Sequence, residues 1–178
     1  MDINLIVKIT TRAWSLRILA LLDQGVPGRQ AALLQATKAG RTAFAQSLHH
    51  LIDLGLLERN PGHGHPLRPE YRLTPNGIEA AAMAHRVLCA VPNEQDAPLL
   101  RRAWTLPVLT VSPEPRSFTQ IKTALPAITD RALSQTFKQL QGHGWLMRHV
   151  DTAAHPPRAT YHAVNAGLRI NKAVLLSA

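Results

Sequence analysis

The stretch TRAWSL at residues 11–16 returns as RRAWTL at residues 101–106, with a spacing of 90 residues. Self-similarity at a fixed spacing is the signature of repeated structural units. At the same spacing HPLRPEY (65–71) pairs with HPPRATY (155–161), Gln30 with Gln120 and Gly77 with Gly167. Between these blocks the spacing is 89, and Gln46, Leu51, Gly55, Leu57 and Arg59 meet Gln135, Leu140, Gly144, Leu146 and Arg148. Matches in ordered blocks predict a duplicated domain.

Each copy has the same pattern of helices, turns and strands. Phe44, Leu48 and Leu51 recur at helical spacing in the third helix of the first copy. Thr129 is a predicted N-cap, and Gly55 and Gly144 are predicted helix stops. We expect helices over 13–22, 29–37, 41–55 and 78–91 and strands over 56–60 and 69–74, then helices over 103–111, 117–125, 129–144 and 168–178 and strands over 145–150 and 159–164.

Helix, helix, turn, helix and β-hairpin in that order predict a winged helix-turn-helix. The predicted fold class is therefore mainly α with small β-hairpin wings (α+β), in two tandem winged helix-turn-helix domains. The predicted division is residues 1–91 for the first domain, 92–98 for the linker and 99–178 for the second domain. Pro92 and Pro98 bracket the polar linker PNEQDAP.

The charge of the chain points to a polyanionic partner. Lys and Arg number 20 against 11 Asp and Glu, so the net charge is +9 and the isoelectric point is about 10.8. Both halves are basic, with 10 basic and 6 acidic residues in 1–90 and 10 and 5 in 91–178. Such a chain attracts nucleic acid or an anionic membrane surface.

The single cysteine, Cys89, excludes an intrachain disulfide framework and favours a reducing compartment. We expect Cys89 to be buried as a small hydrophobe. The N-terminus does not resemble a signal peptide, and no uncharged apolar stretch is long enough to span a bilayer. A cytoplasmic protein is expected.

Catalytic and metal chemistry receive little support from the sequence. The histidines of HGH (63–65) and HH (49–50) lack the additional spaced ligands that a metal site needs. No paired carboxylates, Ser/His/Asp set or Gly-rich phosphate loop is present. We expect no cofactor, no metal and no enzymatic activity. Trp14 and Trp104 are predicted to pack in the core or between the copies.

The second copy resembles the HxlR-type winged-helix transcription regulators, which are related to the MarR-type regulators. The resemblance covers almost all of residues 100–172 and rests on WTL, RSFTQIKTALPAIT, LSQTFKQLQGHGWLMR and the wing end PPRATYH. The first copy keeps AWSL, LHHLIDLGLLER and HPLRPEYRLTPNG, but PGRQAALLQATKAGR departs from the pattern. Such regulators are usually single-domain homodimers. The resemblance therefore implies either a covalent pseudo-dimer in one chain or a pair of tandem chains with four winged helices.

In this fold the third helix enters the major groove of DNA. Its exposed side is predicted to carry Arg41, Thr42, Ala45, Gln46 and His49 in the first copy and Arg131, Ser134, Gln135 and Lys138 in the second. The wings carry the predicted contacts Arg59, Arg68, Arg148 and Arg158, accompanied by Arg72, His63, His65, His149, His155 and His162. Asp130 complements the helix N-terminus but repels phosphate, so it either accepts from a cytosine amino group or marks a copy with weaker DNA affinity.

The predicted function is a transcription regulator that binds double-stranded DNA, as a monomeric pseudo-dimer or a homodimer. Two alternative functions are compatible with the same residues. One is a tandem winged-helix module that binds a protein partner and has reduced DNA binding, which Asp130 and the divergent first-copy turn favour. The other is a regulator gated by a small-molecule effector in a pocket between the copies, near Trp14 and Trp104.

Overall fold

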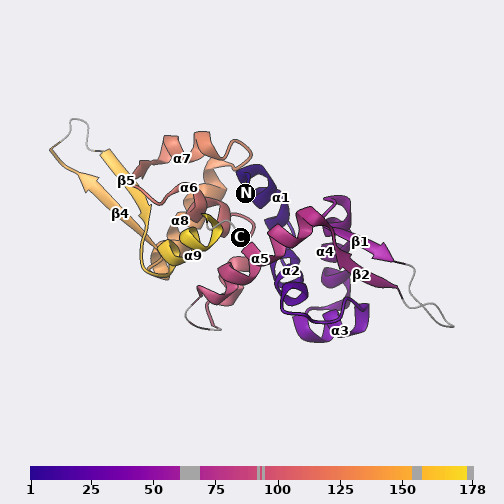
Figure 1. The fold of residues 1–178 in the computed structure, drawn as a ribbon. Helices are drawn as coiled ribbons and strands as arrows, with labels where there is room; N and C mark the ends of the chain where they lie inside the picture. Colours follow the sequence, from indigo (N-terminus) through magenta and orange to yellow (C-terminus); the bar gives the residue numbers. More distant parts are fainter. Residues whose placement is uncertain (61–68, 92, 94, 154–157, 176–178) are drawn as a thin grey trace.

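Two units of the same architecture follow one another along the chain (Figure 1). The computed structural model describes residues 1–60, 69–91, 93, 95–153 and 158–175. The first unit comprises α1 (Ile3–Thr10), α2 (Ser15–Asp23), α3 (Gln30–Thr37), α4 (Arg41–Asp53), β1 (Leu57–Asn60), β2 (Glu70–Leu73) and α5 (Pro75–Cys89). The second comprises η1, a 3-10 helix (Ala97–Arg101), α6 (Thr105–Val111), β3 (Arg116–Ser117), α7 (Phe118–Ala124), α8 (Asp130–Gly142), β4 (Leu146–Asp151), β5 (Arg158–Ala163) and α9 (Ala166–Leu175). The predicted fold class, mainly helical with small hairpins, is confirmed.

Helices α4 and α8, which correspond to the predicted third helix of each unit, end in the same way. Gly55 and Gly144 have φ angles of +68° and +66°, a region that favours glycine. After Gly144, the N–H of Trp145 donates to the Leu140 carbonyl oxygen at 2.8 Å. The equivalent bond after Gly55 joins the N–H of Leu56 to the Leu51 carbonyl oxygen at 3.0 Å. These bonds form the Schellman motif, which confirms the two predicted helix stops.

A close backbone approach fixes the last helix of each unit against the residue that follows this stop. A Cβ atom on Gly77 would lie 2.9 Å from the carbonyl carbon of Leu56, and one on Gly167 would lie 2.9 Å from that of Trp145. The same carbonyl oxygens accept from the N–H groups of Thr74 and Val164, at 3.1 and 3.0 Å. The match between Gly77 and Gly167 in the sequence therefore reflects a contact with no room for a side chain.

The N-termini of the helices differ more between the two units. Thr129 accepts from the N–H of Ala132 at 3.2 Å, which confirms the predicted N-cap of α8. The equivalent Gly40 gives α4 no side-chain cap. Ser117 and Gln120 form a capping box at the start of α7. In α3 the equivalent of Ser117 is Arg29, which has no capping side chain.

The short helix before the turn aligns at a spacing of 88, not 90. Arg29 and Ser117 are both N-caps, and the fully buried Leu33 and Ile121 occupy the same position in α3 and α7. The sequence match of Gln30 with Gln120 is therefore wrong as a structural equivalence. Gln120 completes the capping box of α7 whereas Gln30 is the first residue of α3, so the two glutamines have different positions and their recurrence in the sequence was a coincidence.

The wing of the second unit contains a strand that the sequence did not predict. β4 and β5 pair antiparallel from Leu146 with Ala163 to Asp151 with Arg158. β3 adds to the other edge of β5, so that the strand order is β3-β5-β4. In the first unit β1 pairs with β2, and a single bridge between Arg29 and Glu70 stands where the third strand would be.

The two units join through their first and last helices. α5 and α9 are equivalent in the repeat and pack against each other, and α1 packs on α6 of the other unit. Arg86 Nε donates to the Ala173 carbonyl oxygen at 3.1 Å across the α5–α9 seam. The buried apolar side chains of both units form one continuous cluster. A two-fold dimer likewise places a helix against its own copy.

Trp14 contributes to this join. Both Trp14 and Trp104 are partly buried and pack against the core, which confirms their predicted role. The Arg101 guanidinium carbon lies 4.8 Å from the centre of the Trp14 ring, in cation–π geometry. Arg101 belongs to η1, so this contact links the two units.

Three features of the chain around the join differ from the sequence expectations. α1, whose apolar residues Ile6 and Ile9 are fully buried, was not predicted as a helix. η1 begins inside the stretch expected to be a linker, and Asp96 Oδ1 lies 3.0 Å from His143 Nδ1 just beyond α8.

Cys89 is exposed, so the prediction that it is buried is wrong. It lies two residues beyond the buried Val87, which places it about 200° around the helix from that face.

None of the described helices combines the length and the apolar character needed to cross a membrane.

The close approach of the last helix generates the first prediction. Gly167→Ala should lower the free energy of unfolding by about 1–3 kcal/mol, because the Trp145 backbone cannot move away without disturbing α8. Gly77→Ala should act in the same direction through Leu56. Thermal unfolding followed by circular dichroism measures the effect. Gly142→Ala, where no atom lies within 4 Å of the added Cβ, is the control and should be neutral or slightly stabilising. Equal stability of Gly167→Ala and the parent would contradict the packing described.

Candidate nucleic-acid interface

Helices α4 and α8 present a polar face to solvent on each unit. Their apolar residues, Phe44, Leu48, Leu133 and Phe137 among them, are buried beneath this face. All eight predicted helix contacts are exposed: Arg41, Thr42, Gln46 and His49 on α4, and Arg131, Ser134, Gln135 and Lys138 on α8. Ala45, the first-copy counterpart of Ser134, is half-buried and offers no hydrogen-bonding group. The structure thus brings each predicted quartet onto one helix face.

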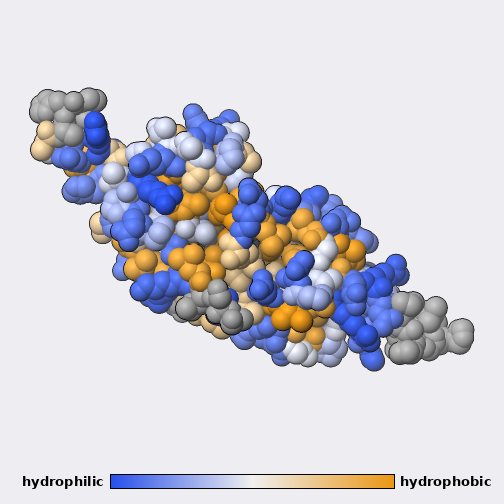
Figure 2. Space-filling view, turned by 45° about the horizontal axis from the view of Figure 1, so that its top comes forward, coloured by the Kyte–Doolittle hydropathy of each residue, from blue (hydrophilic) through white to orange (hydrophobic). Residues whose placement is uncertain are grey.

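The wings lie at opposite ends of the molecule (Figure 1). Figure 2 shows hydrophilic residues gathered toward these two ends on the face in view, with hydrophobic residues between them. Arg59, Arg148 and Arg158 are exposed on β1, β4 and β5, as are Arg72 and His149, whereas His162 is half-buried. The predicted contacts Arg68, His63, His65 and His155 lie outside the described residues.

Two of the wing arginines are engaged by neighbouring side chains. Arg72 forms an ion pair with Glu70, with 2.9 Å between Nη2 and Oε2. Arg148 Nε lies 3.4 Å from the hydroxyl of Tyr161, its cross-strand partner in the β4–β5 ladder. The charge of Arg72 is therefore partly offset by Glu70. Arg148 has an aromatic neighbour and keeps its charge available to a polyanion.

The electrostatics at the start of α4 and α8 differ between the units. In α4 the first helical residue is Arg41, and the exposed Lys38 precedes it at the turn with a φ angle of +57°. In α8 the first helical residue is Asp130. The turn and the first residue of α4 therefore present two cations in the first unit, while in the second unit Asp130 precedes Arg131.

Lys122 of α7 explains how the second unit accommodates Asp130. Its ammonium group lies 3.8 Å from the Asp130 carboxylate and donates to the Ile128 carbonyl oxygen within the turn. Lys122 thus stabilises the turn between α7 and α8, and the Asp130 carboxylate partly offsets the positive charge of Lys122. Sequence reasoning did not predict that Lys122 lies beside Asp130. The signal that could have found it was the acid itself, since an acid at a helix N-terminus that would face phosphate suggests a nearby cation.

The histidine pair of α4 has two separate roles. His50 Nε2 lies 2.8 Å from the Lys8 carbonyl oxygen and 3.0 Å from Thr11 Oγ1, so His50 ties α4 to the end of α1. His49 stays on the exposed face, with Nδ1 2.9 Å from the Ala45 carbonyl oxygen. Within the described part of the chain, no three His, Cys, Asp or Glu side chains gather as metal ligands would.

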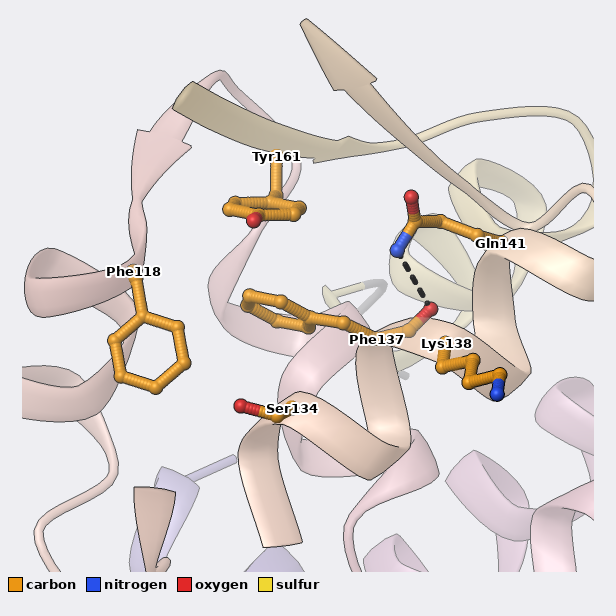
Figure 3. A pocket seen from close by; sticks show the side chains of 6 residues that line it. All are labelled: Phe118, Ser134, Phe137, Lys138, Gln141 and Tyr161. Carbon is orange, nitrogen blue, oxygen red and sulfur yellow. Dashed lines mark hydrogen bonds between the residues drawn. The ribbon is translucent and has the colours of Figure 1, made fainter. Parts of the chain in front are cut away.

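A shallow pocket opens on the polar face of the second unit (Figure 3), and sequence reasoning did not predict it. Its volume is about 240 Å³. It is lined by Phe118 of α7, by Ser134, Phe137, Lys138 and Gln141 of α8, and by Tyr161 of β5. Two of these, Ser134 and Lys138, belong to the predicted DNA-contacting set. The pocket therefore lies within the candidate interface of one unit, away from the predicted site between the copies.

Two helix-turn-helix units, each with a hairpin wing and an exposed polar third helix, define a tandem winged helix-turn-helix protein of the DNA-binding regulator class. The family model described as HxlR-like helix-turn-helix matches the chain twice, over residues 9–93 and 99–176. The chain belongs to the HxlR-like helix-turn-helix family, as the resemblance implied, and carries two copies of its domain. No curated protein matches the chain.

The acid at the start of α8 generates the second prediction. Asp130→Asn removes a negative charge from a helix end that faces a polyanion in this class of protein. The change should raise affinity for duplex DNA about 3- to 10-fold at low salt, because one carboxylate–phosphate repulsion is lost. Fluorescence anisotropy with a labelled duplex measures it.

Asp53→Asn is the matched control, since Asp53 is the last residue of α4 and lies at the helix end opposite to the position equivalent to Asp130. It changes the net charge by the same amount and should alter DNA affinity less than twofold. Equal gains in both variants would assign the effect to net charge and not to the position of Asp130.

Proposed function

We propose that this chain is a transcription regulator that places its two recognition helices, α4 and α8, in successive major grooves of one DNA duplex. The observation that carries the proposal is the repeated exposed polar helix on two family domains whose cores are fused into one. A net charge of +9 supplies the sequence-independent attraction to phosphate.

The side chains of the recognition helices divide into base-reading and phosphate-contacting groups. Arg41 and Arg131 can each donate two hydrogen bonds to one guanine, and Gln46 and Gln135 can pair in the same way with adenine. The hydroxyls of Thr42 and Ser134 serve either base, while His49 and Lys138 lie one turn further along the helix. We assign Arg59, Arg68, Arg148 and Arg158 of the wings to phosphate or minor-groove contacts, which position the protein without reading sequence.

A single chain is the proposed binding unit. Residues 1–91 and 99–178 act as the two halves, and 92–98 connects them. The seam between α5 and α9 supports this assignment, because each helix covers the face that a second subunit would otherwise cover. Free chains should therefore be monomeric at the concentrations at which they bind DNA.

The third prediction concerns the arginines at the start of the two helices, Arg41 on α4 and Arg131 on α8. Arg41→Ala and Arg131→Ala should each weaken binding to the preferred duplex by about 5- to 150-fold and relax base preference at one position. Arg148→Ala should instead weaken binding to all duplexes alike and reduce the salt slope by about one unit. Electrophoretic shifts against the DNA upstream of the chain's own gene, titrated with salt, separate the two effects.

Arg17→Ala is the control for the loss of one positive charge, since Arg17 is exposed on α2 outside the proposed interface. Its effect on affinity should stay below threefold. Binding that does not change with Arg41→Ala and Arg131→Ala, or that does not fall with added salt, would contradict the assignment of α4 and α8.

The difference between the two helices generates the fourth prediction. The exposed residues of α4 and α8 are not the same, so the best operator should be asymmetric, with unlike half-sites one helical turn apart. Selection from a random duplex library, followed by sequencing, identifies the preferred site. A perfect palindrome as the best site would show that both halves read alike, or that two chains bind together.

A further inference from the structure

The pocket on the second unit concentrates the aromatic residues of the chain. The whole sequence holds three Trp, two Tyr and three Phe, and two of these Phe and one Tyr line this one opening. Phe137 and Tyr161 stack with ring centres 4.1 Å apart and planes inclined by 31°. Phe118 meets Phe137 edge-on at 5.9 Å. Phe118 and Tyr161 are half-buried and Phe137 lies buried between them, so the open space is bordered by aromatic side chains and suits another flat apolar ring.

The rim of the pocket is polar and cationic. Among the lining residues Lys138 carries the only charge, and Ser134 and Gln141 supply an uncharged hydroxyl and amide. Figure 3 shows the Ser134 hydroxyl below Phe137, with Lys138 and Gln141 on the side of Phe137 away from Phe118. Arg148 adds a second cation behind the wall, because its Nε lies 3.4 Å from the Tyr161 hydroxyl. The lining therefore favours an anionic group attached to an apolar ring.

The size of the pocket limits the ligand to a small molecule. The volume is about 240 Å³. A buried apolar cavity of about 150 Å³ holds one benzene molecule, so this pocket has room for one ring with a substituent. It is smaller than the range of about 300–1,000 Å³ typical of sites for larger ligands.

The first unit does not repeat this chemistry. At the positions equivalent to the six lining residues, in their order along the chain, it has Gln30, Ala45, Leu48, His49, Ile52 and Tyr71. Tyr71 is the single Phe, Tyr or Trp among these six residues, and it is buried. The two units thus share their backbone and differ in the surface that the third helix presents.

We propose that the pocket binds a monocyclic aromatic carboxylate and that this ligand releases DNA from the second unit. The ring lies against Phe118, Phe137 and Tyr161, and the carboxylate accepts from Lys138, whose flexible stem lets the ammonium turn over the opening. The release of DNA rests on the proposed function. Ser134 and Lys138 cannot contact a ligand and the major groove at once, so the ligand and DNA compete for them. Ligand binding to one unit then lowers the affinity of the whole chain for its operator.

The fifth prediction concerns binding of sodium benzoate, the probe, to the full chain without DNA. Isothermal titration should give a dissociation constant on the order of 1 mM, as expected for so small a ligand. Phe118→Leu, which removes one ring and keeps an apolar side chain beside Phe137, should weaken benzoate binding at least fivefold. Lys138→Gln should weaken benzoate binding by a similar factor and leave binding of benzyl alcohol within twofold. Gln30→Leu, at the position equivalent to Phe118, is the matched control and should leave benzoate binding unchanged.

The second stage measures competition with DNA. With 10 mM benzoate, the affinity of the parent chain for its preferred duplex should fall about tenfold, as mass action requires for ligand at ten times its dissociation constant. Sodium acetate at 10 mM, which has the charge without the ring, should change affinity less than twofold. Phe118→Leu should bind DNA like the parent and lose the response to benzoate.

Each failure has a separate meaning. Equal benzoate binding by the parent and Phe118→Leu overturns the pocket assignment, and equal effects of acetate and benzoate on DNA binding overturn the proposed release. Benzoate binding without loss of DNA affinity overturns the release and leaves the proposed function standing. A chain that binds benzoate and no duplex refutes the proposed function and the release with it. Loss of DNA affinity in Phe118→Leu, without benzoate binding to the parent, would show that the rings receive a base of the operator.

Discussion

The seam between α5 and α9 is the interaction on which the arrangement of the molecule depends. A winged-helix unit of this size has a small core and leaves one face of its last helix to be covered. The chain covers this face with the same helix of its second copy, and Arg86 hydrogen-bonds across the seam to the Ala173 carbonyl oxygen. Because the two cores merge, the relative position of α4 and α8 is a property of one folded chain and does not depend on protein concentration.

Covalent fusion also frees the two copies to diverge. In a homodimer every substitution appears on both recognition helices, so both half-sites change together. Here Arg41 and Asp130 occupy the same first position of α4 and α8, and the aromatic pocket has no counterpart of like chemistry in the first unit. Under the proposed function, one half can specialise in anchoring to phosphate while the other acquires a regulated surface. Asp130, which had favoured a module with reduced DNA binding, also balances Lys122 within the turn.

Local sequence signals identified most of the secondary structure. The helix stops at Gly55 and Gly144 and the cap at Thr129 depend on a few adjacent residues, so they were predictable. α1 was missed because its eight residues make only about two turns, which is too short for a clear helical period. β3 was missed because two residues become a strand only when β5 lies beside them. The wrong pairing of Gln30 with Gln120 arose from identity alone, where only buried positions such as Leu33 and Ile121 set the register.

The sequence by itself determined the duplication, the winged helix-turn-helix order of elements and the polar faces of α4 and α8, because helical periodicity and capping are local. It predicted that Trp14 and Trp104 pack, but not that the Arg101 guanidinium lies over the Trp14 ring. Only the tertiary structure decided that Cys89 is exposed, that Lys122 meets Asp130, and that Phe118, Phe137 and Tyr161 border one pocket. These three rings come from α7, α8 and β5. Their meeting depends on how the wing folds back over the recognition helix, which no periodicity along the chain encodes.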